Sequence, residues 1–483
     1  MKNGVLLQAF EWYLEADQQH YKRLQAALPD LAARGISAIW LPPVCKATGP
    51  EDVGYGIYDL YDLGEFEQKG AIASKYGKKA ELLALIESAH DLNLQVYADV
   101  VLNHKAGADR TEACQAVEVN PQNREERIAE AKEIEAWTYF DFPGRKGAYS
   151  DFVWHWYHFT GVDYDAREEK KGLYRLLGEN KYWSEAVSQE NGNFDYLMFA
   201  DIDHSHPEVR AELLHWAKWF IQETKIDGFR LDAAKHIDAN FMRDFVGAIA
   251  AEQGKNFFFV AEYWENNEAT LDHYLAETEN QLAIFDVVLH FHFHEASQAQ
   301  GHYELRRIFD GTAVQNDPLH AVTFVENHDS QPDQALASTV EAWFKPLAYA
   351  LILLRQEGYP CVFWADLFGS GDGQIPAQTE LLHKLLNLRQ NYAKGEQNDY
   401  WEREDLIGWV RRGEGEEQPL AVLMTIREAQ ELRMFVGEKQ AGQRYVDVIH
   451  EEQPAVTIGE DGFGLFTVPA GSLSCWVRED CEI

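Results

Sequence analysis

The sequence predicts a (β/α)8 TIM barrel with a domain inserted after the third strand and an antiparallel β domain at the C-terminal end. Three observations lead to this fold class. Short β-like runs alternate with amphipathic helices, which is typical of parallel βαβ units. Eight such strand-like runs lie before residue 394, enough for a complete barrel. From residue 394 on, helical periodicity is lost and β alternation replaces it.

The first three strands precede the insertion. They are predicted at residues 5–10, 36–41 and 94–101, where apolar and β-branched side chains cluster. Between the second and the third, Leu82, Leu85, Ile86 and Ala89 recur at helical spacing and predict a helix over residues 80–89.

Residues 105–205 do not follow this rhythm. Aromatic residues, glycines and charge clusters such as Arg124-Glu125-Glu126 replace it. A stretch of this length inside a compact barrel is expected to be a folded inserted domain rather than a linker.

The βα rhythm returns at Pro207, a favourable first residue of a helix, and Val209, Leu213, Trp216 and Phe220 form one stripe of that helix. Five more strands are predicted, at residues 228–231, 257–261, 283–287, 321–325 and 361–363, and further helices at 342–354 and 380–390. In the tail, residues 407–410 and 473–477 show β alternation. We therefore expect a barrel in two parts (1–104 and 206–393), an inserted domain (105–205) and a C-terminal β-sandwich domain (394–483).

Composition excludes several classes of partner. The 483 residues include 80 acidic and 43 basic ones, which gives a net charge of −37. Such a surface repels phosphate backbones and anionic lipids, so we expect no nucleic acid and no membrane as partners. The longest uncharged apolar run, residues 346–354, is far shorter than the roughly 20 residues that span a bilayer. We expect a soluble monomer with a neutral or cationic ligand.

The five cysteines are an odd number, lie far apart and form no C-x-x-C pair. Neither a disulfide scaffold nor a structural zinc site is expected from them, and reduced thiols are typical of a cytoplasmic protein. The residues before the first strand lack the apolar region and cleavage site of a signal peptide. We expect a cytoplasmic enzyme; a secreted enzyme whose leader has been removed would give the same sequence.

Acidic side chains follow three of the predicted strands, at the barrel end that carries active sites. Asp232 follows the fourth strand, Glu262 the fifth and Asp329 the seventh. A single acid after a strand is often only a helix N-cap. Three acids that converge from three strands, two of them beside His or Arg, favour a catalytic site.

Cleavage of an acetal requires two carboxyl groups beside the bond, one ionised and one protonated. Arg230 lies two residues before Asp232, so both side chains share one strand face and the guanidinium can keep Asp232 ionised as a nucleophile. Glu262 follows the apolar run 257–261. An apolar flank raises a carboxyl pKa, which suits a general acid.

Four segments resemble the signature segments of the α-amylase family of glycoside hydrolases and occur in the family's order. They are Asp99-Val-Val-Leu-Asn103-His104, Gly228-Phe-Arg-Leu-Asp232-Ala-Ala-Lys235-His236, Val260-Ala-Glu262-Tyr-Trp264 and Phe324-Val-Glu-Asn-His328-Asp329. The resemblance covers the barrel and the insertion, residues 8 to 360, and is closest to the bacterial liquefying and cytoplasmic α-amylases.

The resemblance implies a role for each matching residue. Asp232 would be the nucleophile that forms a glycosyl-enzyme ester, Glu262 the general acid and then the base, and Asp329 the carboxylate that grips sugar hydroxyls. Six side chains would bind the α-glucan substrate: Tyr55, His104, Arg230, Lys235, Trp264 and His328. The implied reaction is endo-acting, retaining hydrolysis of α-1,4-glucosidic bonds in starch, glycogen or maltodextrins, with nucleophile and acid about 5–5.5 Å apart.

The resemblance also implies a structural Ca2+ between barrel and insertion, held by oxygen ligands that suit calcium. The implied ligands are the side chains of Asn103, Asp195 and Asp201 and the main-chain carbonyl of His236. The liquefying enzymes have two further aspartates where this chain has Thr160 and Ser184. We therefore expect one weak Ca2+ site at most and no calcium–sodium cluster.

Two further patterns need an interpretation. His290, His292 and His294 alternate as if on one strand face, but only Glu295 stands near to complete a metal site, so we interpret them as structural. At the eighth strand, Phe363-Trp364-Ala365-Asp366 replaces the family's usual Tyr-Gly, which would alter the far wall of the pocket.

Alternatives to this hydrolase stay open at this point. A transglycosylase, an isomerase or a maltooligosaccharide-specific hydrolase would use the same framework and differ in subsite shape. A non-catalytic glucan-binding scaffold would be expected to lack Asp232, Glu262 or Asp329, and all three are present.

Overall fold

The structure is a computed structural model that describes residues 3–254, 256–415 and 418–481. Met1 and Lys2, part of the N-terminal segment in which no signal peptide was predicted, lie outside the described residues. Within the described residues, no helix is both long and apolar enough to cross a membrane.

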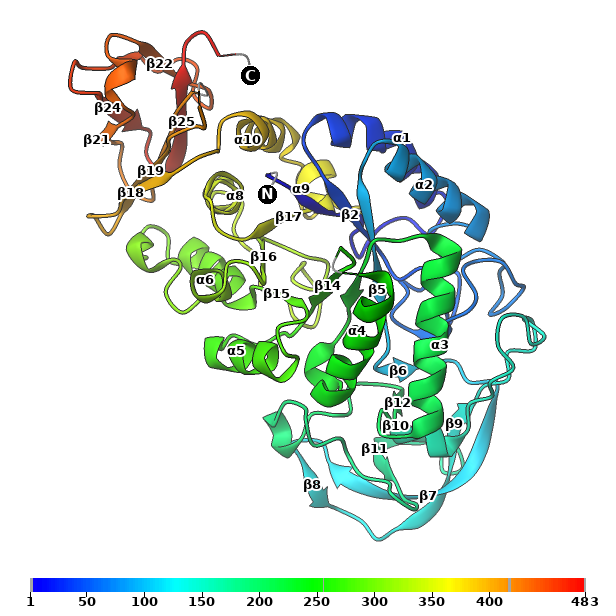
Figure 1. Ribbon diagram of the computed structural model, residues 1–483. Helices are drawn as coiled ribbons and strands as arrows, with labels where there is room; N and C mark the ends of the chain where they lie inside the picture. The colour runs from blue at the N-terminus through cyan, green and yellow to red at the C-terminus, as the bar shows by residue number, and fades with distance from the viewer. Residues whose placement is uncertain (1–2, 255, 416–417, 482–483) are drawn as a thin grey trace.

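Eight parallel strands close into a barrel, as predicted (Figure 1). In barrel order they are β1 (Leu6–Gln8), β17 (Tyr359–Phe363), β16 (Ala321–Phe324), β15 (Ala283–Phe285), β14 (Phe258–Ala261), β13 (Gly228–Leu231), β5 (Gln95–Val100) and β2 (Ala38–Leu41). The barrel closes where Leu6 of β1 lies opposite both Cys361 of β17 and Ala38 of β2.

Helices surround this barrel and bury their apolar stripes against it. The predicted stripe of α3, from Val209 to Phe220, is buried. The helices are α1 (His20–Ala33), α2 (Lys79–Asp91), α3 (Pro207–Thr224), α4 (Ala239–Gln253), α5 (Glu268–Glu277), α6 (Val287–Gln298), α7 (Ala313–Asn316), α8 (Lys345–Leu354), α9 (Trp364–Phe368) and α10 (Thr379–Asn391).

Two local predictions were wrong. His290, His292 and His294 lie in helix α6 and not on a strand, because the Asp286 side chain accepts the Leu289 N–H and begins a helix there. Each histidine hydrogen-bonds a backbone carbonyl of another segment, and His290 Nδ1 lies 2.8 Å from Val325 O.

The second error concerns the end of the eighth strand. β17 ends at Phe363, and Trp364 to Asp366 belong to the short helix α9. Trp364 packs against His20 and Phe368, with ring centroids 5.2 and 4.4 Å away. The departure from the family pattern is therefore in a helix that follows the barrel strand.

The insertion forms a mainly antiparallel sheet of seven strands. Its strands are β6 (His104–Lys105), β12 (Ala200–Ile202), β10 (Phe159–Asp165), β11 (Lys170–Leu176), β7 (Arg110–Asn120), β8 (Asn123–Arg127) and β9 (Lys132–Tyr139), the last paired with β7. A small ribbon of β3 (Lys46–Ala47) and β4 (Ile57–Asp59) lies between β2 and α2 in the chain and contacts the start of the insertion, where the Ala106 N–H donates to Ile57 O at 2.7 Å.

The tail forms two antiparallel sheets around their own apolar core, which includes Val410, Met434 and Trp476. The larger sheet has the order β18 (Gln397–Tyr400), β19 (Leu406–Arg411), β20 (Leu420–Thr425), β25 (Ser472–Arg478), β22 (Arg444–Asp447), β23 (Val456–Thr457), and the smaller pairs β21 (Gln430–Phe435) with β24 (Phe463–Val468). Figure 1 shows this tail and the insertion at opposite ends of the molecule. The domain limits at residues 104, 205 and 393 stay predictions.

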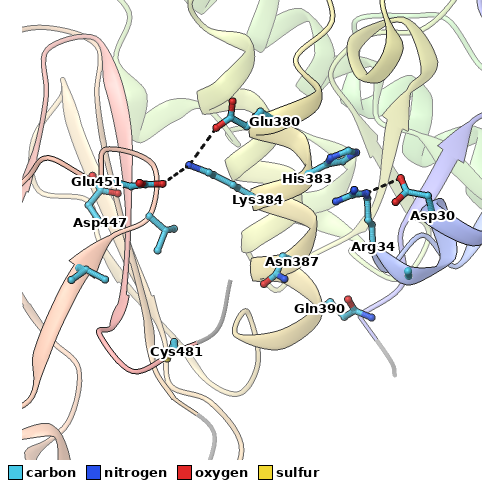
Figure 2. A pocket seen from close by; sticks show the side chains of 13 residues that line it. Asp30, Arg34, Glu380, His383, Lys384, Asn387, Gln390, Asp447, Glu451 and Cys481 are labelled. Atoms are coloured by element: carbon cyan, nitrogen blue, oxygen red, sulfur yellow. Dashed lines mark hydrogen bonds and ion pairs between the residues drawn. The ribbon is translucent and has the colours of Figure 1, made fainter.

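A cleft of about 800 Å³ lies between α1, α10 and the C-terminal sheet (Figure 2). Its charged side chains pair with one another: Lys384 Nζ is 3.2 Å from Glu451 Oε1, and Arg34 Nε is 2.8 Å from Asp30 Oδ2. The Lys384–Glu451 pair links helix α10 to the tail and so joins the barrel to the C-terminal sheets.

Candidate active site

Arg230 lies at the centre of the predicted site and is fully buried. The strand register places it beside Asp99 of β5, and Nη1 lies 2.9 Å from Asp99 Oδ1 and 2.6 Å from Asp232 Oδ1. Its other terminal nitrogen, Nη2, lies 3.3 Å from Glu262 Oε2. One guanidinium therefore contacts three carboxyl groups, including both members of the predicted catalytic pair.

Backbone hydrogen bonds at the strand ends fix Asp232 and Glu262. The Asp232 N–H donates to Val100 O at 3.0 Å, and the Glu262 N–H donates to Leu231 O at 3.0 Å. Ala233, in a left-handed conformation with φ 51°, turns its N–H toward Glu262 Oε2 at 2.9 Å. Neighbouring strands β5, β13 and β14 thus present the two acids side by side.

Burial raises the pKa values of Glu262 and Asp329. It raises the pKa of Glu262 to about 8, with the charges of Asp232 and Asp329 acting in the same direction and Arg230 opposing them. The pKa of Asp329 is raised to about 7, mainly by burial and also by Asp232. Glu262 therefore holds a proton at neutral pH, in the direction that its apolar flank predicts.

His328 and Asp329 follow β16 and face this pair. His328 Nδ1 accepts a hydrogen bond from Gln8 Nε2 at 2.9 Å, so Nε2 carries the proton of the neutral ring, 3.3 Å from Asp329 Oδ2. Burial and the charge of Arg230 lower the pKa of His328, which keeps the ring neutral.

An aromatic wall stands beside the carboxylates. The Tyr55 ring is parallel to His328 at 5.1 Å, and Trp12 is parallel to Tyr55 at 6.0 Å. The Tyr55 hydroxyl donates to Asp99 Oδ2 at 2.9 Å, while its carbonyl accepts from His104 Nε2 at 2.8 Å. Flat rings next to polar groups suit a sugar, which has apolar faces and hydroxyl edges.

Lys235 and Trp264 lie next to each other, with Lys235 Nζ 3.4 Å from Trp264 O. Lys235 Nζ is 2.6 Å from Glu190 Oε2 of the insertion and 3.5 Å from Glu265 Oε2. The Trp264 ring packs against His290 and Phe324 at 5.5 and 6.2 Å. Its contacts therefore tie it to the barrel wall, and sugar stacking by Trp264 stays a prediction.

Four groups that shape the site carried no predicted role: Gln8, Trp12, Trp40 and Asp99. Trp40 Nε1 donates to Asp99 Oδ2 at 3.0 Å, and burial raises the pKa of Asp99 to about 7. The sequence did hold one signal, because an acid within the buried run 94–101 has to find a partner inside the barrel.

The predicted calcium ligands come together where the insertion meets the barrel. Asn103 Nδ2 lies 3.4 Å from Asp201 Oδ1, and Thr160 Oγ1 donates to Asp201 Oδ2. Asn103 Oδ1 and Asp195 Oδ2 are buried and make no hydrogen bond to the described residues. Burial raises the pKa of Asp195 to about 7, and the charge of Asp203 acts in the same direction. Burial also raises the pKa of Asp201 well above its ordinary value, and the charge of Asp195 adds to this.

Two buried oxygens without hydrogen-bond donors, Asn103 Oδ1 and Asp195 Oδ2, fit a hard cation. His236 is also buried there, and its Nδ1 lies 2.7 Å from Phe194 O. Lys181 and Asp203, whose charge acts on Asp195, form a buried ion pair in which each side chain is 4% exposed.

A different cluster, His158, His206 and Glu208, brings three potential metal ligands within 4.8 Å of one another. However, His158 Nδ1 accepts the His155 N–H and His206 Nδ1 accepts the Glu208 N–H. In neutral imidazoles both Nε2 atoms then carry protons, which leaves no lone pair for a metal. The His158 Nε2–H points at Glu208 Oε2, 3.2 Å away, which explains the cluster without an ion.

Residues 24–409 match the family described as "Alpha amylase, catalytic domain". The chain belongs to this alpha-amylase family. The resemblance seen in the four segments and the prediction of a glycoside hydrolase are thereby confirmed.

Relatives within the alpha-amylase family match over nearly their whole length. The chain is 49% identical over 481 residues to an alpha-amylase of Bacillus licheniformis, covering 99% of this chain and 94% of that one. It is 48% identical over 480 residues to the glucan 1,4-alpha-maltohexaosidase of Bacillus sp. strain 707 (99% and 93%). It is 40% identical over 493 residues to the cytoplasmic alpha-amylase of Escherichia coli K12 (99% and 100%).

Solved structures agree on the fold. The alpha-amylase from Geobacillus thermoleovorans, complexed with acarbose, superposes with a TM-score of 0.65 at 18% identity, over 99% of this chain and 98% of that one. Similarity at this level of identity supports the barrel and its added domains, and it carries no information on specificity.

Proposed function

We propose that this protein is an endo-acting, retaining hydrolase of α-1,4-glucosidic bonds in starch, glycogen or maltodextrins. Asp232 is the nucleophile, Glu262 the general acid and base, and Asp329 the carboxylate that binds sugar hydroxyls. Tyr55, His104, Arg230, Lys235, Trp264 and His328 bind the substrate around the cleavage point.

The observation that carries this proposal is the Arg230 guanidinium shared by Asp232 and Glu262. It holds Asp232 Oδ1 at 2.6 Å and Glu262 Oε2 at 3.3 Å, while Glu262 has its pKa raised to about 8. A carboxylate in close ion pairing and a protonated carboxyl group on the same guanidinium are the pair that retaining glycosidases need.

The reaction then follows in two displacements. Glu262 gives its proton to the glycosidic oxygen as Asp232 Oδ attacks the anomeric carbon, and the leaving chain departs as an alcohol. Glu262, now ionised, takes a proton from water, which attacks the same carbon and releases Asp232. Two inversions give net retention.

The test is the configuration of the fresh product. During hydrolysis of maltoheptaose, NMR is expected to show the α anomer first and the β anomer only after mutarotation. An initial β product would mean direct displacement by water and would remove the nucleophile role from Asp232.

Substitution tests the individual roles. Asp232→Asn and Glu262→Gln keep volume and remove one chemical function each, so both should lower kcat by about 10³-fold or more while the protein stays folded. Any variant that retains more than about a tenth of wild-type turnover contradicts the role given to that residue.

A maltooligosaccharide-specific hydrolase is the second candidate. One relative at 48% identity is named a glucan 1,4-alpha-maltohexaosidase, so a preference for one product length is compatible with this framework. The chain-length profile of products from soluble starch separates the two: a dominant single maltooligosaccharide at early times supports the second candidate, and a broad mixture supports the first.

We also propose one structural Ca2+ at Asn103, Asp195, Asp201 and the His236 carbonyl. The buried oxygens Asn103 Oδ1 and Asp195 Oδ2, which lack hydrogen-bond donors, support this site. Thr160 and Ser184 add no charge there, so the ion faces two carboxylates and should bind weakly. Its contribution is to join barrel and insertion, and it takes no part in the chemistry.

A cytoplasmic location is proposed on two grounds. One relative at 40% identity is named a cytoplasmic alpha-amylase, and the five cysteines are free thiols. A monomer, and domain limits at residues 104, 205 and 393, are proposed with it. Fractionation of the native host and light scattering of the purified protein test the first two.

A further inference from the structure

Three charged side chains are buried together next to the turn that carries Asp329. Glu326 follows β16, Lys345 begins α8 and Asp366 lies in α9, and they are 1%, 3% and 0% exposed. Lys345 Nζ lies 2.5 Å from Asp366 Oδ1 and 3.5 Å from Glu326 Oε1. The Tyr349 hydroxyl donates to Asp366 Oδ2 at 2.6 Å. Burial of two acids around one ammonium is costly unless each lone pair finds a donor.

This network continues into the turn that carries Asp329. Glu326 Oε2 accepts a hydrogen bond from Ser330 Oγ at 2.7 Å, and Ser330 Oγ accepts the Asn327 N–H at 3.0 Å. Asn327 Oδ1 in turn accepts the N–H groups of Asp329 at 2.9 Å and Ser330 at 2.8 Å. An unbroken series of hydrogen bonds therefore joins Glu326 to the backbone of Asp329.

The second oxygen of Glu326 is also engaged. Oε1 accepts the Val340 N–H at 2.5 Å in addition to its contact with Lys345. Ser330 Oγ, the Val340 N–H and Lys345 Nζ are all hydrogen-bond donors, so a carboxylate can accept from each of them and an amide in its place cannot.

The Asp329 side chain has little to hold it in place. Within the described part of the chain its carboxylate accepts no hydrogen bond, and Oδ2 lies 3.3 Å from Nε2 of the His328 ring, which is neutral and so forms no ion pair with it. Its direction is therefore determined by the backbone of the turn from Asn327 to Ser330.

We propose that Glu326, Lys345, Asp366 and Ser330 form a positioning network that orients Asp329 toward the sugar. None of the four is a catalytic residue. They act through the turn, and the inference rests on the proposed function because it assumes that Asp329 binds substrate.

Ser330→Ala is the sharpest test, since it cuts the link between network and turn without leaving a charge unpaired. Ser297→Ala is the matched control: Ser297 is equally buried, and its Oγ likewise both donates, to His294 O at 2.7 Å, and accepts, from the Glu341 N–H at 3.1 Å. Both variants should lose similar thermal stability. Only Ser330→Ala should lower kcat, by about 10- to 100-fold, with KM changed less than about twofold, because small misplacements of a catalytic group carry costs of this size.

Measuring the effect of Ser330→Ala in the Asp329→Asn variant distinguishes a role in positioning Asp329 from a general effect on the active site. If Ser330 acts through Asp329, Ser330→Ala changes the residual activity of Asp329→Asn by less than about twofold. Equal loss in both backgrounds, or a kcat no lower than that of Ser297→Ala, overturns the positioning role. If Asp329→Asn itself keeps wild-type activity, the proposed function is at fault instead. Ser330→Cys, which keeps the volume and weakens the hydrogen bonds, replaces Ser330→Ala if that variant fails to fold.

Discussion

The activity should decline in alkaline solution as Glu262 loses its proton, and the pH of this decline should be determined by the burial of Glu262. A pKa of about 8 leaves roughly 90% of the carboxyl groups protonated at pH 7 and roughly 10% at pH 9. A solvent-exposed glutamate, with a pKa near 4.3, would be less than about 1% protonated at pH 7. Because only the protonated form can donate to the glycosidic oxygen, kcat/KM should fall about tenfold from pH 7 to pH 9.

The assay compares two substrates. Maltoheptaose needs a proton on its leaving oxygen, whereas α-maltosyl fluoride releases fluoride without one. The alkaline decline of kcat/KM should therefore appear with maltoheptaose and be absent with the fluoride.

Two results would refute this reasoning. A decline centred near pH 5 would show that burial does not raise the pKa of Glu262 in solution. The same alkaline decline with both substrates would show that the titrating group acts on something other than leaving-group protonation, such as the nucleophile or the fold.

Three further outcomes are expected. Burial and Asp232 raise the pKa of Asp329 to about 7, so the stability that this carboxyl group contributes is complete below about pH 4 and is lost as the pH rises through 7. Asp329→Asn should therefore have a higher melting temperature than wild type at pH 8 but not at pH 4. A lower melting temperature of the variant at pH 8 would contradict this. A chelator should lower the melting temperature by only a few degrees and leave most of the activity, because a weak calcium site adds little stability. The site would instead be tight if the chelator inactivated the enzyme fully and micromolar calcium, but not sodium chloride of equal ionic strength, restored the activity. Lys181→Met leaves the buried Asp203 without its ion-pair partner and should lower the free energy of unfolding in urea by about 3–5 kcal/mol. The double variant Lys181→Met/Asp203→Asn should lose clearly less. Equal losses in the two variants would show that the broken ion pair is not the cause.

The parts of the fold that sequence predicts well are those with a local signal. Strands such as residues 228–231 and helices such as α3 repeat a period that burial on a barrel requires. The error at His290 to His294 has the same origin, because alternating His and Phe imitates a strand. The cap at Asp286, which begins helix α6, was the better signal.

The site divides in the same way. Asp232, Glu262 and Asp329 follow strand ends, so topology alone brings them together. No local sequence pattern indicates a role for Gln8 or Glu326. Gln8 hydrogen-bonds His328, and Glu326 holds the turn through Ser330. Gln8 and His328 are 320 residues apart in sequence, and such pairings become visible only when the barrel closes.

The insertion also determines when the active site can form during folding. β5 and β13 are neighbours in the barrel, yet Asp99 and Arg230 are 131 residues apart in the chain, with the whole insertion between them. Contacts of such long sequence separation form late, because the loop must close before they stabilise anything. The guanidinium that gathers the catalytic carboxyl groups can therefore reach Asp99 only once the insertion has brought its own two ends together. During synthesis on the ribosome, this contact cannot form until the fourth strand has emerged. Until then the incomplete barrel has an unpaired strand edge that could associate with other chains and so needs protection.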